Sequence, residues 1–108
     1  MIWPRILDSM VPNMFTHLEA SANYTVLNLK GGEKLISGYS LNVFEGLFGL
    51  KEFVRLDRSN LINLNFIYSV RHKEDCIFVT LKNDMEILIP RRRIILLQKL
   101  HPKLFKVC

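Results

Sequence analysis

Residues 53–65 read FVRLDRSNLINLN, and residues 89–93 read IPRRR. In the first stretch apolar side chains alternate with Arg, Ser and Asn, as they do in a strand that buries one face. The polar side chains of both stretches belong to types that bind the phosphates and base edges of DNA. Together the two stretches predict a β protein that binds DNA.

A hairpin and a short helix are expected before this region. Residues 18–29 alternate in hydropathy and are expected to form one strand, which turns at residues 30–33, KGGE, and pairs with residues 34–39. Ser40 is the expected N-cap of a helix of two or three turns that Gly49 ends.

The second half of the chain predicts four strands and a second helix. The expected strands are residues 53–57, 60–70, 76–82 and 85–89. Asn83-Asp84 is a turn pair between the last two strands. Residues 91–100 have a helical apolar pattern, and His101-Pro102 ends it. The expected fold class is therefore mainly β with two short helices.

Length and charge limit the class of protein further. With 108 residues and 49% hydrophobic composition, the chain is expected to form a single domain over residues 1–108. Residues 1–50 carry three Lys/Arg and four Asp/Glu, a net charge of −1, whereas residues 51–108 carry twelve and six, a net charge of +6. This distribution predicts an anionic partner that binds the second half.

Cysteine usage and hydropathy predict the compartment. Cys76 lies in an apolar run that is expected to be buried, and Cys108 is the last residue, so a structural disulfide is not expected. Pro4, Arg5 and Asp8 interrupt any signal-peptide core, and no apolar run approaches the roughly 18 residues of a membrane span. A cytoplasmic protein without a membrane partner is expected.

The sequence carries no pattern typical of an enzyme. His17, His72 and His101 are far apart, and His72 with Cys76 does not provide enough ligands for zinc. No glycine elbow surrounds Ser59, and no glycine-rich phosphate loop occurs. Catalytic residues, a metal, a cofactor and a small-molecule substrate are therefore not expected.

Arg91, Arg92 and Arg93 are candidate DNA-binding residues. They begin a predicted helix, where the first turn carries a partial positive charge. Repulsion between this charge and each cation destabilises the helix by about 0.3 to 1 kcal/mol. A phosphate bound there would meet guanidinium groups and backbone amides together. The alternative interpretation is a solvated charge cap.

Arg58 is the second candidate, because arginine reads guanine through two hydrogen bonds. It lies in a bend between two expected strands, next to Asp57 and Ser59. The alternative is an Asp57–Arg58 surface ion pair of little energetic value. Asn63 and Asn65 are interpreted as structural.

Asn23 and Tyr24 form a weaker candidate pair. They enter an expected strand, where an exposed amide and phenol could bind a phosphate or a base. A core tyrosine with a satisfied hydroxyl is the alternative.

These motifs resemble the LytTR family, a DNA-binding domain found at the carboxyl end of many bacterial response regulators. The resemblance covers about residues 13–100. It is carried by Phe53, Arg55, Asp57-Arg58-Ser59 and Leu61-Ile62-Asn63, by Glu19 to Tyr24, and by Pro90-Arg91-Arg92. Asp57, Pro90 and Arg93 depart from the family pattern, which commonly has His, Ser and an aromatic residue there. Asp57 is expected either to orient Arg58 or to accept a cytosine amino hydrogen.

The resemblance implies an elongated stack of small antiparallel sheets whose loops enter successive major grooves of double-stranded DNA. It implies base contacts from Asn23 or Tyr24, Arg58 and Arg92, and phosphate contacts from Ser59, Arg91 and Arg93. Two copies are expected on direct repeats. The receiver domain that usually precedes this family does not occur in the sequence, so the chain is either a stand-alone regulator or a fragment.

Two other functions compete with transcriptional regulation through DNA. A protein-interaction module could dock an acidic partner on the basic second half, with the resemblance marking fold alone. RNA binding is the weakest alternative, because Phe53, Phe66 and Phe78 alternate as core residues do and would not stack on bases.

Overall fold

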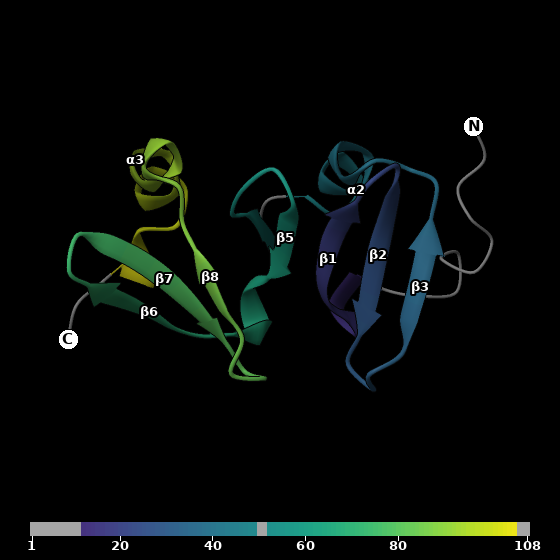
Figure 1. Ribbon diagram of the computed structural model, residues 1–108, viewed down its shortest axis with the longest axis horizontal. Coiled ribbons are helices and arrows are strands. Elements are labelled where there is room, and N and C mark those ends of the chain that lie inside the picture. The colour runs from purple at the N-terminus through teal and green to yellow at the C-terminus, as the bar shows by residue number, and fades with distance from the viewer. Residues whose placement is uncertain (1–11, 50–51, 106–108) are drawn as a thin grey trace. The chain divides into compact units, whose positions relative to one another are not determined.

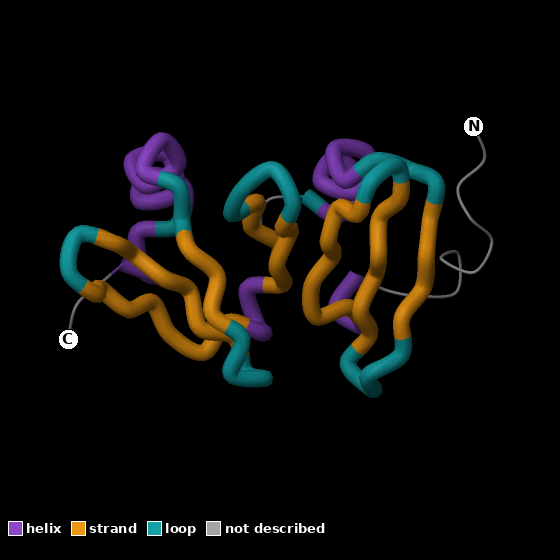
Figure 2. The backbone as a smooth tube through the Cα atoms, in the orientation of Figure 1, coloured by secondary structure: helices purple, strands orange, loops and turns teal. Residues whose placement is uncertain are grey.

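The computed structural model describes residues 12–49 and 52–105, and its contacts divide the chain into two compact units, Met1–Leu64 and Asn65–Cys108. The described residues form eight strands in two antiparallel sheets, two α-helices and three short 3-10 helices (Figure 1, Figure 2). The mainly-β class with two helices is confirmed. The predictions for Pro4, Arg5, Asp8 and Cys108 lie outside the described residues.

The first unit contains a five-stranded sheet and the helix α2. The strands are β1 Phe15–Ser21, β2 Tyr24–Leu29, β3 Lys34–Ser37, β4 Phe53–Arg55 and β5 Asn60–Asn63. Their order across the sheet is β3-β2-β1-β5-β4, and every neighbouring pair is antiparallel. The short 3-10 helix η1, Pro12–Met14, precedes β1.

The prediction of a single strand over residues 18–29 is wrong, because these residues contain a tight hairpin. Ser21 pairs with Tyr24, and Ala22 has a φ of 53° in the turn between them. An alanine gives no sequence signal for a positive φ, which usually falls on glycine or asparagine. The sequence pattern therefore predicts one continuous strand where the structure has a turn.

The β2–β3 hairpin and the helix α2, Leu41–Phe48, form as predicted. Gly32 has a φ of 93° in the hairpin turn, where it avoids the clash of a Cβ atom. Ser40 is the N-cap of α2, and its hydroxyl accepts a hydrogen bond from the Val43 amide at 3.4 Å. Gly49 ends the helix with a φ of 79°.

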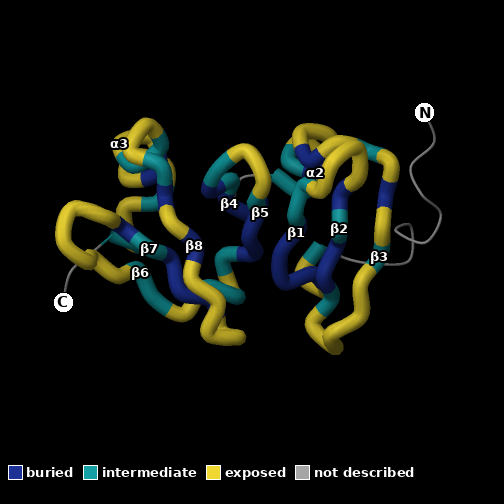
Figure 3. The backbone as a smooth tube through the Cα atoms, in the orientation of Figure 1, coloured by how far each residue is buried: buried dark blue, intermediate teal, exposed yellow. Residues whose placement is uncertain are grey.

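The core of the first unit is rich in aromatic side chains. The Phe48 ring lies 5.8 Å from that of Phe15, 5.7 Å from that of Phe44 and 4.9 Å from that of Phe53. Phe15, Phe44 and Phe53 are fully buried with three leucines of the sheet and Leu41 (Figure 3). The packing of these aromatic rings holds α2 against the sheet.

The second unit contains a three-stranded sheet and the helix α3. The strands are β6 Ile67–Lys73, β7 Cys76–Leu81 and β8 Glu86–Leu88, in the order β6-β7-β8. The turn at Asn83-Asp84 forms as predicted, since the Asn83 side chain accepts a hydrogen bond from the Met85 amide at 3.1 Å. The helix α3, Arg91–Leu100, ends at His101 as expected, and the 3-10 helix η3, Pro102–Phe105, follows.

The prediction of one strand over residues 60–70 is also wrong. This segment divides into β5 and β6 around the 3-10 helix η2, Leu64–Phe66, which lies at the boundary of the two units. Asn63 is buried at the end of β5, where its amide donates to the Phe15 carbonyl at 2.9 Å and to Asn13 Oδ1 at 3.1 Å. Its structural interpretation is confirmed.

The second unit buries aliphatic side chains. Its buried hydrophobic residues, among those the structure describes, are Ile77, Val79, Leu81, Ile87, Ile89 and Leu97. Cys76 is exposed and has a free thiol, so the expectation that it is buried is wrong. It is the first residue of β7, beside the β6–β7 turn, where its side chain lies outside the apolar face.

Candidate nucleic-acid interface

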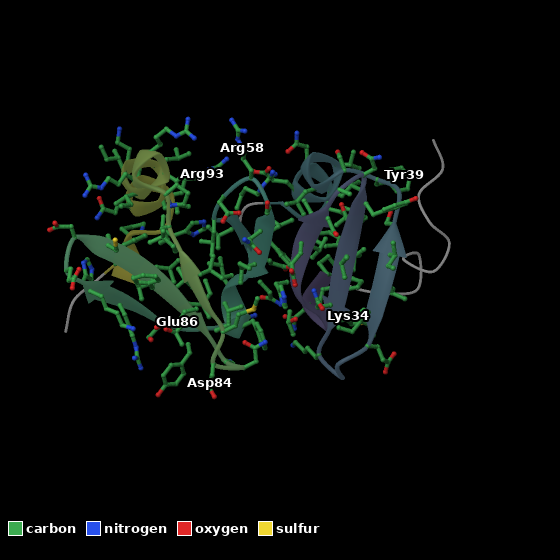
Figure 4. The ribbon with its side chains drawn as sticks, viewed as in Figure 1. Lys34, Tyr39, Arg58, Asp84, Glu86 and Arg93 are labelled. Carbon is green, nitrogen blue, oxygen red and sulfur yellow. The ribbon has the colours of Figure 1, made fainter. Side chains whose placement is uncertain are left out.

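The loop between β4 and β5 places Arg58 on the surface of the first unit. Arg58 is exposed, and in Figure 4 its side chain extends away from the ribbon. Among the described residues no side chain forms a hydrogen bond or ion pair with its guanidinium group. The alternative of an Asp57–Arg58 ion pair is therefore not supported by the observed contacts.

Asp57 shapes the loop instead of pairing with Arg58. Its Oδ1 accepts a hydrogen bond from the Ser59 amide at 2.7 Å, and both carboxylate oxygens accept from the Asn60 side chain at 3.1 Å. This is an Asx turn, in which a short acidic side chain bonds the backbone two residues on. The carboxylate is thus occupied within the loop, where it holds the backbone next to Arg58 and does not pair with the Arg58 side chain.

Arg55 also fixes this loop, through hydrogen bonds to its backbone. Its Nε donates to the Asp57 carbonyl at 2.6 Å, and its Nη2 donates to the Arg58 carbonyl at 2.9 Å. Its Nη1 donates to Asn42 Oδ1 and to Glu45 Oε1 on α2, both at 2.8 Å. The loop is therefore tied to a helix that is itself fixed in the core.

The turn between β1 and β2 lies at the same end of the sheet as this loop. The Ala20 amide donates to the Ser59 carbonyl at 2.9 Å, and Glu19 pairs with Asn60 across β1 and β5. Asn23 and Tyr24 are both exposed beside it, with Tyr24 at 57% of its full surface. The alternative of Tyr24 as a core residue is wrong. The structure thus brings four of the predicted residues to one end of the first unit: Asn23, Tyr24, Arg58 and Ser59.

Arg91, Arg92 and Arg93 lie in the second unit, at the start of α3. Arg91 and Arg92 are exposed and Arg93 is half-buried. The first turn contains no acidic residue, and the N-cap residue Pro90 makes no side-chain cap bond. Pro90 precedes the helix rather than occupying its first position. The Arg93 amide donates to the Pro90 carbonyl at 2.9 Å.

Sequence reasoning gave no role to Arg55, Asn42 or Glu45. The Asp at the start of the Asp57-Arg58-Ser59-Asn60 bend is a sequence signal for the Asx turn. The helix partners of Arg55 are ten and thirteen residues away along the chain, and no local pattern connects them. Only the folded first unit shows the connection.

Within residues 12–49 and 52–105, no three His, Cys, Asp or Glu side chains gather closely enough to hold a metal ion. Over the same residues, neither α-helix has the length and apolar run needed to cross a membrane.

The fold and these surface arginines define a small mainly-β domain of two sheets with basic loop and helix-start positions. The family model of the LytTr DNA-binding domain matches residues 12–101. The chain therefore belongs to the LytTR family. This is a family of DNA-binding domains of transcription regulators and not a family of enzymes.

A solved structure supports the same fold. The LytTr DNA-binding domain of a putative methyl-accepting/DNA response regulator from Bacillus cereus superposes with a TM-score of 0.72 at 24% identity. The superposition covers 82% of this chain and 81% of that one. Comparison with the sequences of curated proteins gives no significant match.

Proposed function

We propose that this chain binds double-stranded DNA in a sequence-specific manner and regulates bacterial transcription. The observation that carries the proposal is the Arg58 loop: an exposed arginine without a carboxylate partner among the described residues, on a backbone fixed by hydrogen bonds. An arginine held in this way can offer its paired donors to guanine in a major groove.

The proposed contacts divide between reading and positioning. Arg58, Arg92 and either Asn23 or Tyr24 contact bases, while Ser59, Arg91 and Arg93 contact phosphates. The exposure of Tyr24 and Arg58 supports this division in the first unit. In the second unit it is supported by the exposure of Arg92 and by the absence of an acidic residue from the first turn of α3.

We further propose that the chain acts in the cytoplasm and that two copies bind direct repeats. Selection of bound duplexes from a random DNA pool tests both specificity and spacing. The expected result is one enriched motif that occurs twice in the same orientation. A pool that stays random after repeated rounds would contradict sequence-specific binding.

A protein-interaction module is the second candidate, because the second unit carries nine Lys/Arg and four Asp/Glu, a net charge of +5. Such a surface also fits an acidic protein. Competition separates the two functions. If an acidic protein partner binds and a selected duplex fails to displace it or to bind alone, the second candidate is favoured.

A further inference from the structure

We infer that Arg55 is a positioning residue for DNA recognition: it locks the β4–β5 loop to α2 so that Arg58 is presented in one orientation. This inference rests on the proposed function of Arg58 and extends it to a residue whose own side chain is nearly buried. Arg55 is the third residue of a strand, and its side chain is only 10% exposed.

The contacts of Arg55 are divided between two segments. Two bonds go to carbonyl groups of the loop, at Asp57 and at Arg58 itself. Two more go to side chains of α2, at Asn42 and Glu45. One guanidinium group therefore joins the backbone of the proposed reading residue to a helix.

The planar shape of guanidinium is needed for this connection. Its donors leave the group in fixed directions, so Nε and Nη2 can reach two successive parts of the loop while Nη1 faces α2. A lysine would keep the positive charge but offer three donors from one nitrogen atom. It could not satisfy the loop carbonyls and the helix side chains at once.

The helix end of the connection is firm. Leu41 and Phe44 of α2 are buried in the aromatic core, and Ser40 caps the helix. Asn42 and Glu45 project from this fixed helix toward Arg55. The loop therefore takes its position from the core of the unit and not only from its own Asx turn.

The loop end determines how Arg58 is presented. Nε of Arg55 holds the Asp57 carbonyl at 2.6 Å and Nη2 holds the Arg58 carbonyl at 2.9 Å, one in each peptide group that flanks Arg58. The Asp57 carboxylate adds a bond to the Ser59 amide at 2.7 Å. With both peptide groups that flank the Arg58 side chain fixed, little backbone freedom remains to be lost on binding. Such preorganisation improves discrimination between bases, because a poorly held side chain adapts to the wrong base.

The first experiment measures the ratio of affinities for a selected duplex and for the same duplex with the Arg58-dependent base pair changed. Arg58→Ala is expected to lower this ratio by roughly 5- to 150-fold. Arg55→Lys, which preserves net charge, is expected to lower it by about tenfold, and the milder Glu45→Gln by about threefold. A further variant combines Arg55→Lys with Arg58→Ala. Its ratio should equal that of Arg58→Ala alone, because the two residues act on one contact.

A second readout does not depend on DNA. In Arg55→Lys the Ser59 amide, which is bonded to Asp57, should exchange with solvent at least several-fold faster, whereas the Leu29 amide, bonded to Glu33 in the β2–β3 turn, should be unchanged. A general loss of stability would accelerate both amides. If Arg55→Lys unfolds, Asn42→Ala provides the same test with one helix contact removed.

The outcomes separate this inference from the proposed function. If wild-type protein selects no DNA motif, the proposed function fails, and the exchange measurement still tests the connection to α2. If the wild type is specific and Arg55→Lys keeps the full affinity ratio, Arg55 is not a positioning residue. Unchanged exchange at Ser59 in Arg55→Lys would overturn the inference in the same way.

Discussion

The two units differ in how they are held together and in the charge they carry. The first unit has an aromatic core, a capped helix and a net charge of zero, from six Lys/Arg and six Asp/Glu. The second has an aliphatic core, a helix without a side-chain cap and a net charge of +5. The proposed DNA-binding residues occur in both.

This difference suggests a division of labour within the proposed function. In the first unit Arg58 is held by a neutral, well-packed scaffold, which suits the reading of a base. In the second unit Arg91 and Arg93, on either side of the proposed base-contacting Arg92, add charge to an already basic surface, which suits attraction to phosphates.

The largest expected effect is the salt dependence of DNA affinity. About five to eight phosphate contacts predict a log-log slope near −0.9 per contact, so raising salt from about 50 to 200 mM should weaken binding by roughly three orders of magnitude. The slope should become shallower by about 2 when Arg91 and Arg93, the two arginines of the α3 start proposed to contact phosphates, are both changed to alanine. Arg58→Ala should alter it by at most about 1. Fluorescence anisotropy measures both, and a flat response of the wild type would count against DNA binding.

Core substitutions should affect the two units differently. Phe53→Ala removes a fully buried ring that lies 4.9 Å from Phe48, and should lower the free energy of unfolding by about 3 to 5 kcal/mol. Leu97→Ala, at the one buried residue described in α3, should lower it by about 2 to 3 kcal/mol. Urea denaturation gives both values. Equal losses would show that the aromatic core gives the first unit no advantage.

The base preference assigned to the first unit is expected to depend on Arg58. Arg58→Ala should reduce discrimination at one base pair by about 1 to 3 kcal/mol. Arg71→Ala is the matched control, because it removes the same charge from an exposed residue of β6. The control should weaken binding to all duplexes equally. Uniform weakening by Arg58→Ala as well would refute base reading.

The cap of α2 should make a smaller contribution that has no side-chain counterpart at α3. Ser40→Ala removes the hydroxyl that accepts the Val43 amide, and should lower the free energy of unfolding by about 0.5 to 1 kcal/mol. Ser40→Thr retains a hydroxyl and should remain close to wild type. Thermal unfolding followed by circular dichroism measures both, and equal losses in the two variants would exclude the cap bond as the cause.

The smallest expected effect is a pH dependence in the second unit. Burial lowers the pKa of His101 from its usual 6.5, because desolvation disfavours the charged imidazolium. The unfolded chain then binds the proton more readily than the folded chain, so stability is retained above pH 6.5 and falls as the pH drops below it. Urea midpoints for wild type and His101→Gln between about pH 7.5 and 5.5 measure the effect. An identical pH dependence in the two proteins would exclude His101 as its source.

Some of these features could be predicted because their causes are local in the sequence. Gly32 and Gly49 mark positions of positive φ, Ser40 marks a helix start, and Asn83 marks a turn. Each acts on backbone groups only a few residues away, so the signal and the structure occupy the same short segment. The motifs around Arg58 and Arg91 also sufficed to suggest the family that the comparison confirms.

The remaining features depend on contacts between distant segments. The sequence does not predict that strands end near Ala22 and at Asn63. The positive φ of 53° at Ala22 has no local signature, and the hydrogen bond of Asn63 goes to Phe15, 48 residues away. The sequence alone thus determined the class of fold and the residue types offered to DNA. Tertiary structure decided where strands end and which arginine supports the loop, because the hydrogen bonds of Arg55 exist only after α2 packs on the sheet.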